Sequence, residues 1–145
     1  MIALLQRVTE ASVAVAGKEI ARTGPGLLVL VAIEKGDDEA RTKRMVERIS
    51  GYRVFEDDQG KMNLGLKQVS GELLLVSQFT LAADTQKGMR PSFSSAATPE
   101  EGEKWFNRLV ELASQELDMV KTGQFGADMK VSLVNDGPVT FWLQV

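Results

Sequence analysis

The feature that most constrains the fold is the almost wholly apolar run Gly26–Ile33, which reads GLLVLVAI. A strand with one face in water alternates apolar and polar side chains, and this run offers no polar face. It is therefore typical of a strand that is buried on both faces. The run Glu72–Thr80 (ELLLVSQFT) is apolar as far as Ser77 and predicts another strand.

A first helix is predicted directly after the apolar run. It opens near Asp37 or Asp38, either of which can cap it, and acidic residues suit the positive end of the helix dipole. An apolar stripe from Met45 to Ile49 predicts the face that meets the sheet.

A second helix has the clearest start signal in the chain. Thr98 is a capping residue, Pro99 takes the first helical position and Glu101 completes a capping box. The apolar residues from Trp105 onward recur at helical spacing, which favours packing on the sheet over a cofactor role for Trp105 or Phe106.

The remaining strands are predicted near both ends of the chain. They cover Ala3–Val8, Ser12–Val15, Ile20–Arg22, Tyr52–Phe55, Lys130–Val134 and Val139–Val145. The mixture of strands and helices, without a repeat or a linker, predicts a single mixed α/β domain over residues 1–145 with its helices packed against the sheet.

The chain has no cysteine and no histidine, which narrows its chemistry. Disulfides, thiolate zinc sites, cysteine nucleophiles and Ser-His-Asp triads are excluded. The segment 24–26 lacks the spacing of a phosphate loop, and the acidic turn Glu56–Gly60 lacks the ligand spacing of a calcium loop. We therefore expect no metal and no cofactor. Any proton transfer would use carboxylates, Lys, Tyr, water or the substrate itself.

Charge and hydropathy restrict the partners. The net charge of -3 argues against a protein that coats nucleic acid, but it permits a local basic patch that grips an RNA end. No apolar run approaches the length of a membrane span, and the opening MIALLQRVTEASV does not resemble a signal peptide. A cytoplasmic location without a membrane partner is the expectation.

Two short stretches could carry chemistry. In Ser77–Thr80 (SQFT), a buried strand ends in side chains and backbone N–H groups that can bind an anion. In Asn135–Thr140 (NDGPVT), Pro138 stands where a strand returning from a hairpin turn would begin to pair. An ordinary structural role stays open for both: a strand end that caps the next loop, and a simple hairpin turn.

Together the two stretches resemble the paired signature of the D-aminoacyl-tRNA deacylases (the D-tyrosyl-tRNA(Tyr) deacylase family). The resemblance covers the whole chain and includes the opening thirteen-letter motif quoted above, Gly51–Phe55, Met62–Leu64 and Gly88–Phe93. It implies a mainly antiparallel, barrel-like β core with two principal helices packed on it. It further implies hydrolysis of the ester that joins a D-amino acid, or glycine, to the 3′ end of tRNA, by a homodimer with active sites at the subunit interface.

The resemblance also implies how the hand of the substrate is read. Gly137 and Pro138 of one subunit, joined by a cis peptide bond, enter the pocket of the other subunit. A rigid backbone wedge can accept hydrogen bonds from the α-amino group and fill the volume that an L side chain needs. Glycine at position 137 removes a side chain that would crowd the site and allows unusual dihedrals.

The resemblance places catalysis at Ser77, Gln78, Phe79 and Thr80. In one mechanism the Thr80 hydroxyl attacks the ester, although no adjacent base is evident. In the other, the 2′-hydroxyl of the terminal adenosine helps to activate or position water, and backbone N–H groups near Phe79 and Thr80 stabilise the oxyanion. We favour the second mechanism.

Other candidate substrate-binding residues are Ala96, Phe125 and Met129, which match pocket positions of the family, and core or loop packing is the alternative for each. Lys87 and Arg90 are expected to contact phosphates of the tRNA end, with a solvated loop as the alternative.

Two rival functions stay open. One is a general esterase or amidase, which the missing histidine and G-x-S-x-G elbow disfavour. The other is a binding module for a tRNA end or a protein, without turnover.

Overall fold

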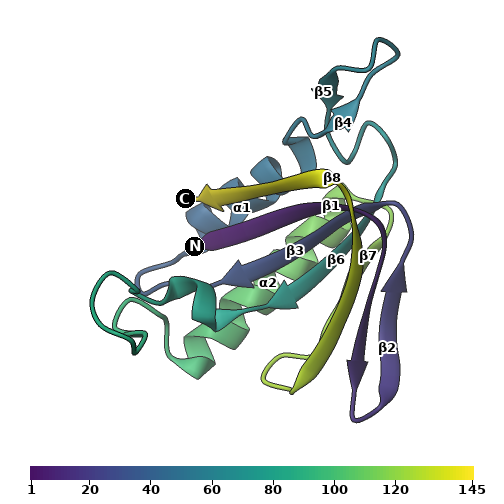
Figure 1. Ribbon diagram of the computed structural model, residues 1–145. Helices are drawn as coiled ribbons and strands as arrows, with labels where there is room; N and C mark the ends of the chain where they lie inside the picture. The colour runs from purple at the N-terminus through teal and green to yellow at the C-terminus, as the bar shows by residue number, and fades with distance from the viewer.

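The computed structural model describes residues 1–145, and its centre is a six-stranded mixed sheet (Figure 1). The strands are β1 (Ile2–Val15), β2 (Lys18–Thr23), β3 (Gly26–Ala32), β6 (Glu72–Ser77), β7 (Val120–Thr122) and β8 (Met129–Gln144). Their order is β2-β1-β3-β6-β7. Strands β2 and β3 pair with different parts of one edge of β1, and β8 pairs with the opposite edge. The pairs that involve β1 are antiparallel, while β3–β6 and β6–β7 are parallel.

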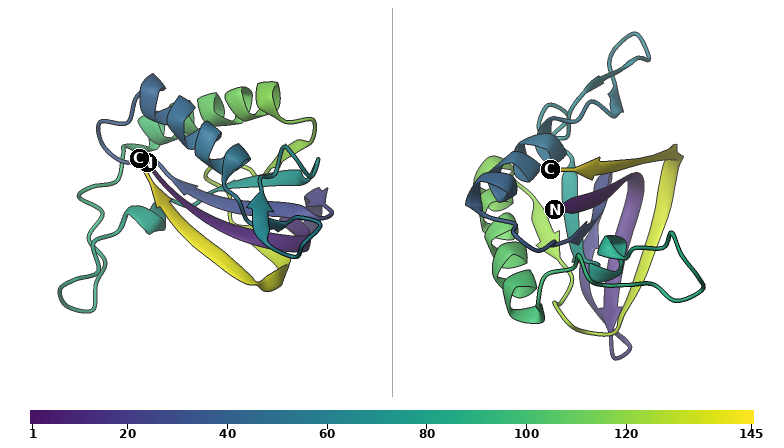
Figure 2. Two further views of the ribbon diagram at one scale, coloured as in Figure 1. Left: turned by 90° about the horizontal axis from the view of Figure 1, so that it is seen from above. Right: turned by 90° about the vertical axis from the view of Figure 1, so that its left-hand side faces the viewer.

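Helices α1 (Glu39–Gly51) and α2 (Pro99–Glu116) lie side by side on one face of the strongly curved sheet (Figure 2). This arrangement confirms the predicted fold class of two principal helices on a barrel-like β core. Asp38 caps α1 by accepting from the Arg41 N–H at 2.9 Å. Thr98 caps α2 by accepting from the Glu101 N–H at 3.3 Å. The prediction that Glu101 completes a capping box is wrong. Its carboxylate does not bind back to the Thr98 N–H but accepts from the Trp105 indole N–H, at 3.0 Å.

Strand β3 is buried on both faces, as the apolar run predicts. Leu27, Val29 and Val31 pack toward the core beneath the helices, with residues such as Phe106. Leu28 packs on the opposite face in a second apolar cluster. Strand β3 therefore contributes buried side chains to both apolar clusters. Each large aliphatic side chain that is fully buried stabilises the fold by about 1.5–3 kcal/mol.

Several strand boundaries differ from the sequence prediction. The two N-terminal strands are one, β1, which pairs with β3 through its first half, with β2 through its second half and with β8 along its length. A register shift between Val8 and Glu10 absorbs the polar residues that suggested a break. Strand β6 ends at Ser77, not Thr80, and a 3₁₀ turn, η1 (Phe79–Ala82), follows. Strand β7 was not predicted, because three residues carry too little periodicity.

A short two-stranded arm, β4 (Phe55–Glu56) with β5 (Met62–Leu64), projects from the body (Figure 1). The predicted strand Tyr52–Phe55 survives only at its last residue. The acidic turn between β4 and β5 is closed by Asp57. Hydrogen bonds from the Asn63 amide and from the backbone N–H groups of Lys61 and Gln59 lower the pKa of this carboxyl. Its oxygens are thereby occupied, and no group of acidic residues in the chain is arranged to hold a metal ion.

The two ends of the chain lie next to each other, beside the loop that follows β3. The N-terminal ammonium donates to Glu34 and to the buried Asp37, each at 2.8 Å. Burial raises the pKa of Glu34, but hydrogen bonds from this ammonium and from Gln144 outweigh that effect and leave it below its ordinary value. Glu34 also forms a β-bridge with Ala96, which anchors the long loop before α2. No helix has the length and apolar character needed to cross a bilayer.

Candidate active site

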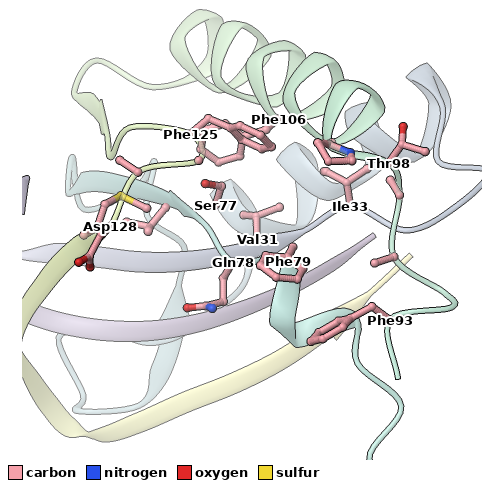
Figure 3. Close-up of a pocket in the computed structure, with 18 of the residues that line it drawn as sticks. Val31, Ile33, Ser77, Gln78, Phe79, Phe93, Thr98, Phe106, Phe125 and Asp128 are labelled. Carbon is pink, nitrogen blue, oxygen red and sulfur yellow. The ribbon is translucent and has the colours of Figure 1, made fainter. Parts of the chain in front are cut away.

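The principal cavity, of about 590 Å³, lies where the ends of β3 and β6 meet the start of α2 and the β7–β8 connection (Figure 3). Most of its lining is apolar. Phe106 and Phe125 lie on the helix side, with ring centroids 6.1 Å apart, and Phe79 and Phe93 form a second pair at 5.0 Å. Asp128 is the one ionisable side chain in the lining. It is 86% exposed and pairs with Lys130 at 2.9 Å, so the cavity contains no buried acid or base.

Ser77, Gln78 and Phe79 line this cavity, at the point where β6 ends. The Gln78 N–H donates to Val31 O at 2.7 Å and holds the strand end in place. The next two N–H groups, of Phe79 and Thr80, open η1 and donate no hydrogen bond within the chain. Two adjacent free donors beside a cavity can stabilise a developing oxyanion.

Thr80 differs from its three neighbours because its side chain does not line the cavity. Its hydroxyl accepts a hydrogen bond from the Gln78 side-chain amide. No histidine, lysine or carboxylate contacts this hydroxyl, so the structure offers no base to activate it. The geometry therefore agrees with the mechanism in which the Thr80 side chain is not the nucleophile.

Ala96, Phe125 and Met129 all line the cavity. The Met129 sulfur accepts from the Gln124 N–H at 3.4 Å and lies over Gly123, where a Cβ would be only 2.6 Å from the sulfur. The Met129 side chain thus holds the β7–β8 connection closed as well as facing the cavity.

Phe93 and Gly102 are among the lining residues that the sequence prediction did not name. Phe93 closes the mouth beside Phe79, which only the tertiary structure reveals. Gly102 lies in α2, where a Cβ would be 3.4 Å from the Phe125 ring, so the missing side chain makes room for that ring. The sequence did carry a signal for Gly102, because glycine inside a helix costs about 1 kcal/mol and usually has a packing reason.

Lys87 and Arg90 lie outside the cavity, on an exposed loop. Two backbone hydrogen bonds between Asp84 and Ser92, of 2.8 and 3.0 Å, close the base of this loop. Neither cation forms an ion pair or a side-chain hydrogen bond within the chain. Both charges are consequently free to meet an anionic partner.

The stretch around Gly137 and Pro138 is not a hairpin turn, so that reading is wrong. The chain does not reverse: β8 pairs antiparallel with β1 on both sides, through Asn135 opposite Val8 and Thr140 opposite Gln6. The four residues between them bulge out of the ladder. The Gly137–Pro138 peptide bond is cis. Polar turn residues mark a bulge as readily as a hairpin, and only the pairing partner distinguishes the two.

Side chains from two directions hold the bulge. Arg7 donates from Nε to Asp136 O at 2.9 Å and from Nη1 to Val54 O at 2.7 Å. Asn135 spans its base. Gly137 is required by close approach, not by an unusual dihedral, because its φ is not positive and a Cβ would lie 2.3 Å from Val139 N. Gly137 and Pro138 are exposed and do not line the cavity of their own chain.

Comparison with known proteins decides the family. The model of the D-Tyr-tRNA(Tyr) deacylase family matches residues 4–144. The chain belongs to the D-Tyr-tRNA(Tyr) deacylase family. The membership expected from the motifs is thereby confirmed, and with it the prediction that this chain is a hydrolase.

Relatives support the assignment over the full length. A D-aminoacyl-tRNA deacylase of Photorhabdus laumondii is 57% identical over 145 residues, and one of Escherichia coli is 58% identical, each covering 100% of both chains. A solved structure described as c-Myc DNA unwinding element binding protein is 40% identical, with a TM-score of 0.96 over 100% of this chain and 99% of the other. A probable eukaryotic D-amino acid tRNA deacylase shares the fold at 17% identity and a TM-score of 0.86, covering 99% and 98%.

Proposed function

We propose that this member of the deacylase family hydrolyses the ester of D-aminoacyl-tRNA, and of glycyl-tRNA, and leaves L-aminoacyl-tRNA intact. The observation that carries the proposal is the pair of free backbone donors at Phe79 and Thr80, beside an apolar cavity with no acid or base inside it. An aminoacyl ester is already activated, so oxyanion stabilisation and orientation supply the main part of the rate enhancement. Such an activity is chiral proofreading in translation, and its place is the cytoplasm.

The proposed mechanism is substrate-assisted. The 2′-hydroxyl of the terminal adenosine activates or positions a water molecule that attacks the ester carbonyl. The N–H groups of Phe79 and Thr80 then stabilise the oxyanion of the tetrahedral intermediate, and the 3′-hydroxyl of the tRNA leaves. The hydrogen bond from the Gln78 amide to the Thr80 hydroxyl supports a positioning role for that side chain.

Chiral selection requires a second copy of the chain. We assign the wedge to Gly137 and Pro138 of that copy, in a homodimer whose active sites lie at the interface. The assignment is supported by the position of this bulge, which is exposed and absent from the cavity of its own chain. Val134 and Trp142, on the same exposed side of β8, are 50% and 51% exposed, as apolar residues of an unfilled interface would be.

The tRNA end has a candidate contact in the exposed loop. Lys87 and Arg90 are unpaired in a chain whose other cations are mostly neutralised by carboxylates. Phosphates of the 3′ end would supply the missing counter-charge.

A chirality assay tests the function. The protein is incubated with D-tyrosyl-tRNA, L-tyrosyl-tRNA and the ethyl ester of D-tyrosine, and loss of each ester is followed. We expect fast loss of D-tyrosyl-tRNA alone. Equal cleavage of both hands would contradict the wedge, cleavage of the simple ester would favour a general esterase, and binding without turnover would favour a binding module.

A pair of variants at Phe79 tests the oxyanion donors. Phe79→Ala removes the ring and keeps the N–H, whereas Phe79→Pro removes both. Proline is tolerated at this first position of η1, because the Phe79 N–H makes no hydrogen bond within the chain that would be lost. The two variants differ in the N–H and in the fixed φ of proline, which the first position of a 3₁₀ turn accommodates. We expect the proline variant to lose a further 10²–10³ in kcat, as for other oxyanion donors. Equal kcat values for the two variants would remove the Phe79 N–H from the mechanism.

A further inference from the structure

The base of the Gly137–Pro138 bulge is closed by one side chain, that of Asn135. Its Oδ1 accepts from the Val139 N–H at 2.9 Å. Its Nδ2 donates to Val139 O at 3.2 Å and to the Thr140 hydroxyl at 3.2 Å. One amide thus binds both backbone groups of the residue on the far side of the bulge.

This amide replaces a missing piece of the sheet. Between the pairs Asn135–Val8 and Thr140–Gln6, β8 has four residues where β1 has only Arg7, so the backbone of Val139 has no ladder partner on β1. A primary amide offers one acceptor and two donors side by side, which is the pattern a backbone partner would present. Asn135 therefore sets the separation of the two ends of the bulge.

The separation of these ends determines where Gly137 and Pro138 project. The bulge is crowded inside, since Gly137 has no space for a Cβ beside Val139 N, yet its outer side is open to solvent. If the base opened, nothing on the outer side would restore the position of the two residues. The Arg7 side chain holds the start of the bulge through Asp136 O, and it leaves Val139 free.

We propose that Asn135 is a positioning residue for chiral selection: it holds the Gly137–Pro138 pair at the depth that the neighbouring subunit's pocket requires. This inference rests on the proposed function of the pair as a wedge. Asn135 itself is only part-buried, and all three hydrogen bonds of its amide go to Val139 and Thr140, so the amide stabilises the bulge.

The inference is tested with Asn135→Ala, which removes every bond of the amide, and Asn135→Asp, which keeps the acceptor and removes two donors. The measured quantity is the ratio of kcat/KM for D-tyrosyl-tRNA to that for L-tyrosyl-tRNA. This ratio does not depend on how much of the enzyme is folded. We expect it to fall at least tenfold in both variants. Asn107→Asp, the same change at an exposed position of α2, is the matched control and keeps the ratio of the unaltered protein.

Lowering the pH distinguishes positioning from a general structural defect. A protonated carboxyl at position 135 can donate to Val139 O while it still accepts from Val139 N, which restores the pattern of the amide. The ratio for Asn135→Asp should therefore rise as the pH falls from 7.5 to about 4, the ordinary pKa of an aspartic acid side chain, while the ratio for Asn135→Ala stays low.

The outcomes separate the two proposals. A ratio within threefold of the unaltered protein in both variants would overturn the role of Asn135 and leave the wedge in place. A ratio that falls in both variants but does not recover at low pH in Asn135→Asp would also overturn it, because the donors would then be irrelevant. If the unaltered protein itself cleaves both hands equally, the proposed function fails first.

Discussion

Gly137→Ala is the sharpest perturbation that the structure allows. The added Cβ would lie 2.3 Å from Val139 N and 2.6 Å from Val139 Cγ2. An unstrained contact needs roughly 3.5 Å, so the bulge must open by about 1 Å. The nearest atom belongs to the backbone two residues ahead, so no side-chain rotation relieves the clash.

The displacement translates into a rate. Misplacing a catalytic or binding group by about 1 Å costs on the order of 100-fold, or about 2.7 kcal/mol of transition-state stabilisation. We therefore expect kcat/KM for D-tyrosyl-tRNA to fall about 100-fold in Gly137→Ala. The free energy of unfolding should fall by only about 1 kcal/mol, because Gly137 is exposed and the strain can relax into solvent.

The assay measures deacylation of both hands of tyrosyl-tRNA alongside urea unfolding. Gly51→Ala is the matched control, since a Cβ there meets nothing within 4 Å. It should keep full activity. If Gly137→Ala deacylates D-tyrosyl-tRNA at more than a third of the original kcat/KM and still rejects the L form, the bulge does not serve the active site and the reasoning is refuted.

Four further outcomes are expected. Thr80→Ala should keep kcat within about tenfold, because the backbone donors remain; an inactive variant that still binds substrate would restore the nucleophile mechanism. Arg90→Ala should raise KM and reduce the salt dependence of binding by about one unit of slope, and unchanged affinity at low salt would remove the phosphate contact. Gly102→Leu should reduce activity at least tenfold because the added side chain displaces the Phe125 ring; overpacking should cost about 1–3 kcal/mol of stability, of which the higher helix propensity of leucine offsets roughly 0.8 kcal/mol, and full activity would show that this part of the cavity is unused. Thr23→Val should raise the free energy of unfolding by about 1 kcal/mol in urea, because the Thr23 hydroxyl is buried without a hydrogen-bond partner, and a loss of stability would mean that the hydroxyl is satisfied.

Features that depend on a few neighbouring residues were predictable. Burial of β3 follows from its continuous apolar run, and the start of α2 follows from Thr98 and Pro99, because both signals are local. The missing histidine and cysteine exclude an imidazole base and a thiolate nucleophile, and leave carboxylates, Lys, Tyr, water or the substrate for any proton transfer. The motif Ser77–Thr80 pointed to the principal cavity, which its first three residues line, although not to the end of its strand.

Features that depend on distant partners were not predictable. The acidic residue that caps α1 is Asp38, because Asp37 is drawn into the buried contact with the chain's own ammonium, far away in sequence. The cavity gathers residues from β3, β6, α2 and the β7–β8 connection, so Phe93 and Gly102 acquire their roles only when these elements meet.

The Gly137–Pro138 stretch shows most clearly which features neighbouring residues determine and which depend on distant partners. The sequence by itself determined that the chain departs from regular structure there, since glycine and proline weaken any ladder. Whether the departure was a reversal or a bulge depended on which strand lay opposite, and β1 lies opposite on both sides. Hydrogen-bond partners in a sheet are chosen by long-range packing, and so the tertiary structure alone decided that this segment projects outward from one strand, with its base closed by Asn135.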